Sequence, residues 1–130
     1  MNTPAIIYDL LNDYAGITNI VNGISPFVRN RTIDFPAIIY DIQSEDIIND
    51  STSVLYHTAN IDISILSRSQ KEAETILEQV FTRCSQFSGT INGTCVRIVV
   101  DNISREYEAA EDSSSQGIFI TNVSIIANLS

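Results

Sequence analysis

The stretch from 69 to 87, SQKEAETILEQVFTRCSQF, constrains the fold more than any other part of the sequence. Its apolar residues recur at the three- and four-residue spacing of one helix face: Ala73, Ile76, Leu77, Val80, Phe81, Cys84 and Phe87. A helix with one apolar stripe must cover another apolar surface, and strand-like segments lie on both sides of it in the sequence. We therefore expect this helix to pack on a sheet built by the rest of the chain.

The start of this helix is also readable. Ser69 followed three residues later by Glu72 is typical of a capping box, in which the serine hydroxyl accepts from the Glu72 amide and the Glu72 carboxylate accepts from the Ser69 amide. The opposite face of the helix is polar and is expected to be exposed to solvent or to a neighbouring subunit. Its charged residues are Lys71, Glu74, Glu78 and Arg83.

Two further segments precede the central part of the sheet. Thr3 and Pro4 are suited to the N-cap and first position of a short helix that ends near Tyr14. The segment 24–28 is expected to be a short strand at a sheet edge, because Pro26 cannot donate a ladder hydrogen bond.

The middle of the chain predicts two strands separated by a loop. Residues 36–43, PAIIYDIQ, are rich in β-branched and aromatic side chains, and residues 54–66 alternate between apolar and polar side chains. Between them, 44–53 combines acids with turn-forming residues and predicts an exposed, flexible loop. The long strand 54–66 is expected to be central, with one wetter face.

After the long helix, Asn92-Gly93 is a strong two-residue turn signal that leads into a strand ending near 104. This strand is expected to complete a β-α-β crossover. Residues 105–117 hold four acids and predict a flexible arm, and 118–128 returns as the last strand, antiparallel to its predecessor. The expected fold is a single α+β domain over residues 1–130. It has a mixed, mainly antiparallel sheet of about four to five strands, packed against one long helix with a short N-terminal helix.

Charge narrows the range of partners. The net charge is −9 and the pI is about 4.2, so a nucleic-acid backbone or an anionic membrane surface would repel the protein on average. The N-terminal segment has neither a basic n-region nor an apolar run long enough for a signal peptide or membrane span, which favours a cytoplasmic protein without membrane contact. Of the two cysteines, Cys84 lies on the apolar stripe, which favours a core thiol over a disulfide with Cys95.

No arrangement of side chains in the sequence predicts catalysis. The chain has one histidine, His57, and one lysine, and it lacks a Gly-x-Ser-x-Gly elbow and a phosphate-binding glycine motif. His57 is expected to be a partly buried structural residue. The acids of 44–53 match no calcium loop, so we expect no metal site. Because the catalytic and phosphate-binding motifs are missing, we also expect neither an enzyme nor a cofactor site.

The remaining class is binding or assembly through charged loops. Arg29 and Arg31 fit either a solvated loop or a contact with an acidic surface or a passing phosphate backbone. The acids of the two loops are expected contact residues as well. The complete set of expected subunit or partner contacts is Arg29, Arg31, Glu45, Asp46, Asp50, Glu106, Glu108, Glu111 and Asp112.

The order of the segments ITNIVNGI, FPAIIYDI, NIDISILS and SQKEAE, followed by two closing strands around an acidic arm, resembles the tail-terminator and tail-completion proteins of long-tailed bacteriophages. The resemblance spans nearly the whole chain and rests on order and spacing. It implies a virion protein, assembled in the host cytoplasm, that forms a ring, usually a hexamer. Such a ring caps the tail tube, joins it to a head-completion or neck protein, and contacts DNA only as it passes through the lumen.

Two other functions remain open on the sequence. A neck or head-completion ring would have the same kind of sequence, and a small acidic cytoplasmic module could bind one basic partner through the arm. The two ring functions require self-association, whereas the binding module predicts a one-to-one complex.

Overall fold

The structure is a computed structural model that describes residues 2–27, 34–49, 54–109 and 117–130. Within these residues the chain forms three helices and six strands. In order they are α1 (Thr3–Asn12), α2 (Ala15–Thr18), β1 (Ile24–Pro26), β2 (Ala37–Asn49), β3 (Val54–Ser67), α3 (Gln70–Cys84), β4 (Ser88–Ile91), β5 (Thr94–Glu108) and β6 (Ile118–Leu129).

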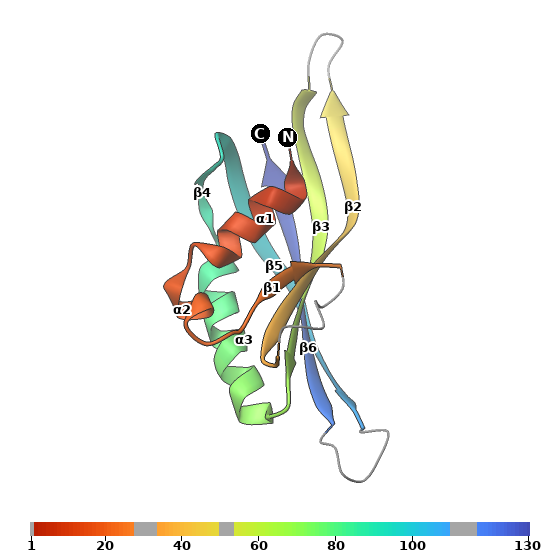
Figure 1. Cartoon of the computed structure of the whole chain (residues 1–130). Coiled ribbons are helices and arrows are strands. Elements are labelled where there is room, and N and C mark those ends of the chain that lie inside the picture. Colours follow the sequence, from red (N-terminus) through yellow and green to blue (C-terminus); the bar gives the residue numbers. More distant parts are fainter. Residues whose placement is uncertain (1, 28–33, 50–53, 110–116) are drawn as a thin grey trace.

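All six strands belong to one strongly twisted, half-barrel sheet with the order β1-β2-β3-β6-β5-β4 (Figure 1). Only β1 and β2 are parallel, and the other neighbouring pairs are antiparallel. The predicted mixed, mainly antiparallel sheet is therefore confirmed, but it has six strands rather than four to five. The additional strand is β4, a short segment that pairs with the start of β5 across the predicted Asn92-Gly93 turn.

Both α1 and α3 lie on the same face of the sheet and bury it (Figure 1). The core joins Ile7 and Leu10 of α1 and Ile76 of α3 to the inward-facing residues of the strands, such as Ile63 and Ile125. The long helix is thus not the sole cover of the sheet. The short N-terminal helix shares that role, because the sheet is too wide for one helix to shield.

The long helix starts where it was predicted to start, but it ends at Cys84, so Phe87 of the predicted stripe lies beyond the helix. Ser69 is the N-cap and accepts from the Glu72 amide at 3.3 Å, but the Glu72 carboxylate accepts from the Ser67 hydroxyl at 2.7 Å instead of from the Ser69 amide. The Ser69 amide donates to the same Ser67 hydroxyl at 3.1 Å. Phe81, predicted on the buried stripe, is 43% exposed.

Arg83 was predicted on the exposed face, yet it is half-buried. Its Nε donates to the Leu10 carbonyl at 2.9 Å, and its guanidinium stacks over the rings of Tyr14 and Phe87. It therefore joins α3 to the C-terminal end of α1. That end has carbonyls left free by the helix, so a cation there is favourable.

Both predicted loops are shorter than expected. Residues 44–49 continue β2 and pair with β3 beyond a bulge at 42–44, and residues 105–108 continue β5 and pair with β6. Cross-strand pairing overrides the polar composition of these segments, because each has a partner strand alongside. Residues 50–53 and 110–116 of the two predicted loops lie outside the described residues.

The predicted β-α-β connection is present only in a wider form. The chain leaves β3, forms α3 and β4, and returns as β5, which runs parallel to β3 with β6 inserted between them.

The first helix starts one residue earlier than expected, because the Asn2 side chain caps it by accepting from the Ala5 amide at 3.2 Å. None of the helices in the described part is long and apolar enough to span a membrane.

Candidate interaction surfaces

The face of the sheet opposite the helices carries rows of hydrogen-bonded polar side chains. Thr58 donates to Asn128 at 3.0 Å and Ser64 donates to Asn122 at 2.7 Å, both from β3 to β6. Between them, Ser124 donates to the Asp62 carboxylate at 2.8 Å. Because these groups satisfy one another across strands, they keep the open face polar and rigid without a covering layer.

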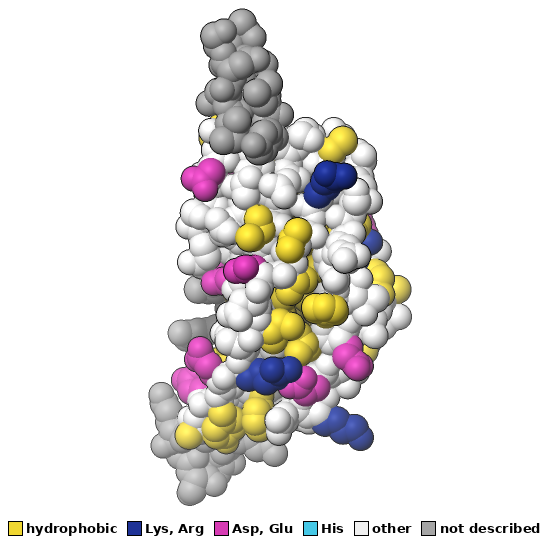
Figure 2. All heavy atoms as spheres, turned by 180° about the vertical axis from the view of Figure 1, so that it is seen from behind, with side chains coloured by type: hydrophobic (Ala, Val, Ile, Leu, Met, Phe, Trp, Pro, Cys, Tyr) yellow, Lys and Arg dark blue, Asp and Glu magenta, His cyan; other side chains and the backbone are white. Residues whose placement is uncertain are grey.

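Apolar side chains interrupt this polar face (Figure 2). The strand register places Leu66 beside Ile120 and Val99 beside Ile126, all on the open side of the sheet. Val99 is 57% exposed. The open face is thus a mixed surface, which is the usual composition of a contact between protein subunits.

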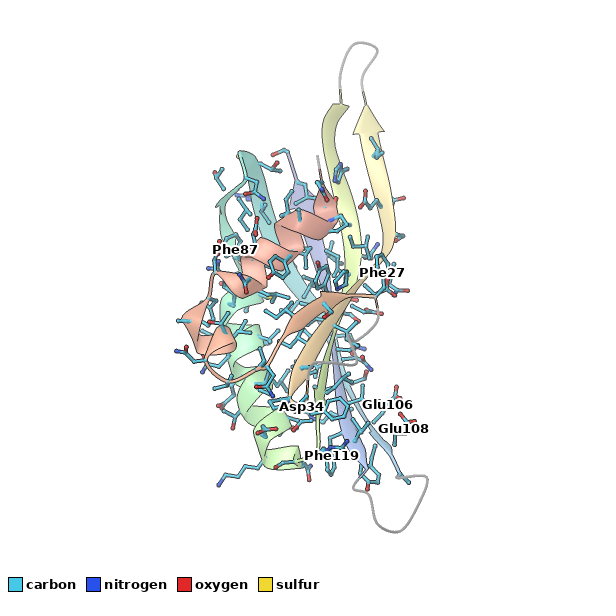
Figure 3. All side chains as sticks on the ribbon, viewed as in Figure 1. Phe27, Asp34, Phe87, Glu106, Glu108 and Phe119 are labelled. Carbon is cyan, nitrogen blue, oxygen red and sulfur yellow. The ribbon has the colours of Figure 1, made fainter. Side chains whose placement is uncertain are left out.

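The expected contact acids are split between the two ends of the sheet. Glu45 and Asp46 are exposed on β2 near the end that leads to 50–53, whereas Glu106 and Glu108 are exposed on β5 near the end that leads to 110–116 (Figure 1). Glu106 and Glu108 point away from the α3 side of the sheet (Figure 3). The structure therefore does not bring the predicted acids into one site. The remaining expected contacts, Arg29, Arg31, Asp50, Glu111 and Asp112, lie outside the described residues.

One ion pair anchors the polar face of α3. Arg105 of β5 donates to Glu74 through Nε at 2.6 Å and through a second guanidinium nitrogen at 3.2 Å. This hydrogen bond from Arg105 lowers the pKa of the Glu74 carboxyl below its ordinary value. Both side chains are well exposed, so the pair orients two surface groups more than it stabilises the fold.

His57 lies inside the structure, as predicted. It is 6% exposed, and its Nε2 lies 3.4 Å from the Thr3 hydroxyl of α1. Within the described ranges, no group of three or more His, Cys, Asp or Glu side chains is arranged to hold a metal ion.

The two cysteines are both free and lie in different environments. Cys84 is fully buried on α3, whereas Cys95 is exposed on β5. Cys95 and Arg97 line an open hollow of about 620 Å³ between β4, β5 and the end of β6. Burial raises the pKa of the Cys84 thiol from 9.0 to about 12. The predicted core thiol at Cys84 is confirmed.

The raised pKa of the Cys84 thiol in the folded protein predicts that stability depends on pH. Because the folded pKa of Cys84 is the higher one, its contribution to stability is complete below about pH 9 and is lost between pH 9 and 12. Between pH 8 and pH 11 we expect the wild type to lose about 2–3 kcal/mol more unfolding free energy than Cys84→Ala, measured by urea denaturation. Equal pH slopes for the two proteins would contradict the burial of this thiol.

The sheet has two edges that are only partly paired. The register pairs β1 with β2 only at Ile38–Tyr40, so residues 41–49 of β2 have no partner strand on that side among the described residues. At the other edge, β4 pairs with β5 only from Thr94 to Arg97. Residues 99–108 of β5 are likewise without a described strand on their outer side. Sequence alternation locates strands but not their neighbours, so these edges could not be predicted.

The fold class of this protein is a six-stranded half-barrel sheet with helices on one face and an open opposite face. The sequence matches no protein-family model and no curated protein. By structure, the chain is similar to a chain in the virion of a native gene transfer agent particle. The TM-score is 0.61 at 11% sequence identity, and the match covers 96% of this chain and 92% of the other. At this identity the likeness establishes a shared fold.

Proposed function

We propose that this protein is a structural subunit of a phage-like virion that forms a ring, with a hexamer as the expected size, at the end of the tail tube. The observation that carries the proposal is the fold shared along nearly the whole length of both chains with a chain of a gene transfer agent virion. The ring ends the tube and joins it to the head or neck. Its partners are further copies of itself, the tail tube protein and a connector protein.

The arrangement of the surfaces supports this function. A subunit between a tail tube and a neck needs contacts at both ends, and exposed carboxylates lie at both ends of this sheet: Glu45 and Asp46 on β2, and Glu106 and Glu108 on β5. A rigid sheet between them keeps the two sets of contacts at a constant distance. The hydrogen-bonded polar rows of the open face provide that rigidity.

The charge of the chain also suits a DNA conduit. With a net charge of −9 per copy, a ring of several copies repels the phosphate backbone, so that DNA passes through its lumen without binding. Asp41 and Asp62 lie on the open face beside one another in the register of β2 and β3. These carboxylates are suited to a lumen-facing surface.

The proposal is tested by assembly. We expect the purified protein, mixed with the tail tube protein of the same virus, to give rings at the tube ends by electron microscopy and a closed oligomer by native mass spectrometry. A protein that stays monomeric at high concentration and does not bind tail tubes would exclude the ring function. A one-to-one complex with a basic partner would favour a binding module instead.

A neck ring is the second candidate within the same class, and a deletion in the producing virus separates the two. Loss of a terminator should give tails of uncontrolled length or tails that cannot join heads. Loss of a neck ring should leave tails of normal length beside heads that leak DNA.

A further inference from the structure

We infer that copies of this protein join edge to edge, with residues 41–49 of β2 in one copy pairing antiparallel to residues 99–108 of β5 in the next. This inference rests on the proposed ring-forming function and specifies the contact that builds the ring. Both stretches are extended, of nearly equal length, about 30 Å each, and without a described strand on their outer side. Unpaired edges of this length are templates for further strand pairing.

Strand direction makes the two edges complementary. Successive antiparallel pairs from β2 through β3 and β6 to β5 leave β2 and β5 running in opposite directions. When identical copies stand side by side in the same orientation, β5 of one copy therefore faces β2 of the next in antiparallel fashion. The helices of every copy then remain on the same side of the continuous sheet.

The direction of the main-chain groups fits as well. Along a strand, residues whose side chains lie on the same face of the sheet direct their N–H and C=O groups to the same side of the strand. All residues of one strand that face the helices therefore point these groups toward the same edge. On β5, the buried Ile98 donates outward to the Phe87 carbonyl at 2.9 Å, and on β2, the buried Tyr40 accepts from the Phe27 amide at 2.9 Å. By register, Glu45 and Arg105 share these inward-facing rows, so their N–H groups point toward the two free edges.

The short strands β1 and β4 determine the stagger. Glu45 lies at the level of Ile98, whereas the middle of the free stretch of β5, at Ile103, lies at the level of Tyr40. Pairing without an offset would make β4 collide with β2 of the next copy. An offset of about five residues, about 17 Å, aligns the free stretches. Each copy contributes four strands, β2, β3, β6 and β5, to the width of the continuous sheet, which is about 19 Å, so this offset gives a strand tilt of about 40°, within the range of closed barrels.

Exposed apolar side chains follow the same edges. Among the described residues, the large hydrophobic side chains that remain exposed are Tyr8, Phe27, Ile47, Phe81, Val99 and Tyr107. Phe27 follows β1, Ile47 lies on the free stretch of β2, and Val99 and Tyr107 lie on that of β5. Pairing of the two edges would bring these four side chains to one interface, whereas Tyr8 and Phe81 belong to the helices.

Both edges are acidic, which regulates the contact. The free stretch of β2 carries Asp41, Glu45 and Asp46, and that of β5 carries Asp101, Glu106 and Glu108 against the single cation Arg105. Like charges repel, so the isolated protein should associate weakly at low ionic strength and more strongly at about 0.5 M salt, where the screening length is only a few ångströms.

The inference is tested with proline on each edge. Glu45→Pro and Arg105→Pro remove one outward N–H each, and Glu45→Ala and Arg105→Ala are the matched controls that lose the side chain alone. At 0.5 M salt, with the tail tube protein present, we expect each proline variant to weaken ring formation by about tenfold relative to its alanine control, measured by native mass spectrometry. Circular dichroism melting verifies that each variant is folded.

Cross-linking provides a second test that does not depend on proline. In a Cys95→Ser background, we expect the double variant Glu45→Cys and Arg105→Cys to give a ladder of covalent oligomers with a short bismaleimide. Each single variant should give no covalent oligomers, and a mixture of the two single variants should give covalent dimers but nothing larger.

Three results would overturn the edge contact. They are rings that form equally in the proline and alanine variants, a ladder from either single-cysteine variant, and a double variant that does not cross-link within wild-type-like rings. Each of these leaves the ring function intact, whereas a wild type that forms no rings at all rejects the proposed function itself.

Discussion

Leu77→Ala is expected to destabilise the fold by about 2–5 kcal/mol, because Leu77 is 6% exposed in the core between α3 and the sheet and its truncation leaves a cavity. Urea denaturation measures the loss as a lower midpoint at an unchanged slope. For a domain whose total stability is about 5–15 kcal/mol, the effect is large.

Phe81→Ala on the same helix is the matched control. Phe81 is 43% exposed, so its truncation removes little buried area and should cost about 1 kcal/mol or less. Equal losses at the two positions would mean that α3 packs with a different face on the sheet. No loss at Leu77 would mean that the helix does not pack on it at all.

Ile125→Asp is expected to have the larger effect and to leave the protein mostly unfolded. Ile125 is 1% exposed on the helix-covered side of β6, and the structure offers no cation beside it among the described core residues. A carboxylate there is buried without a partner, at a cost of about 4 kcal/mol or more. Circular dichroism and the urea midpoint report the loss.

Ile126→Asp, one residue further, is the control for this change. Ile126 points to the open face, where a carboxylate remains in contact with water, so we expect a cost of about 1–2 kcal/mol and a folded protein. If the two aspartates had similar effects, the assignment of the two faces of β6 would be wrong.

Much of the secondary structure could be predicted from local pattern. The stripe of α3, the Ser69 cap, the alternation of β3 and β6 and the Asn92-Gly93 turn are local signals, each read within a few residues, and each appears in the structure. The ends of β2 and β5 were mispredicted as loops, because their polar residues pair with the start of the following strand, β3 or β6, and composition does not reveal this pairing.

The candidate surfaces were predicted less well. The exposed acids Glu45, Asp46, Glu106 and Glu108 were recognised by charge, but nothing in their spacing indicates that they lie at opposite ends of one sheet. The hydrogen-bonded rows of the open face had one signal in the sequence, the alternating Thr58, Asn60, Asp62 and Ser64 of β3. Their partners on β6 could be assigned only from the register.

The sequence by itself determined the helix on which this protein is built, its starting residue, the alternating strands around it and the acidic character of the chain. The helix, its cap and the strands depend on residues only a few positions apart in the sequence, and the acidic character depends on composition alone. Only the tertiary structure decided the strand order, the joint cover by α1 and α3, the role of Arg83 between them and the two sheet edges that no strand of the described residues pairs. These features depend on contacts between residues far apart in the sequence, which no local pattern specifies.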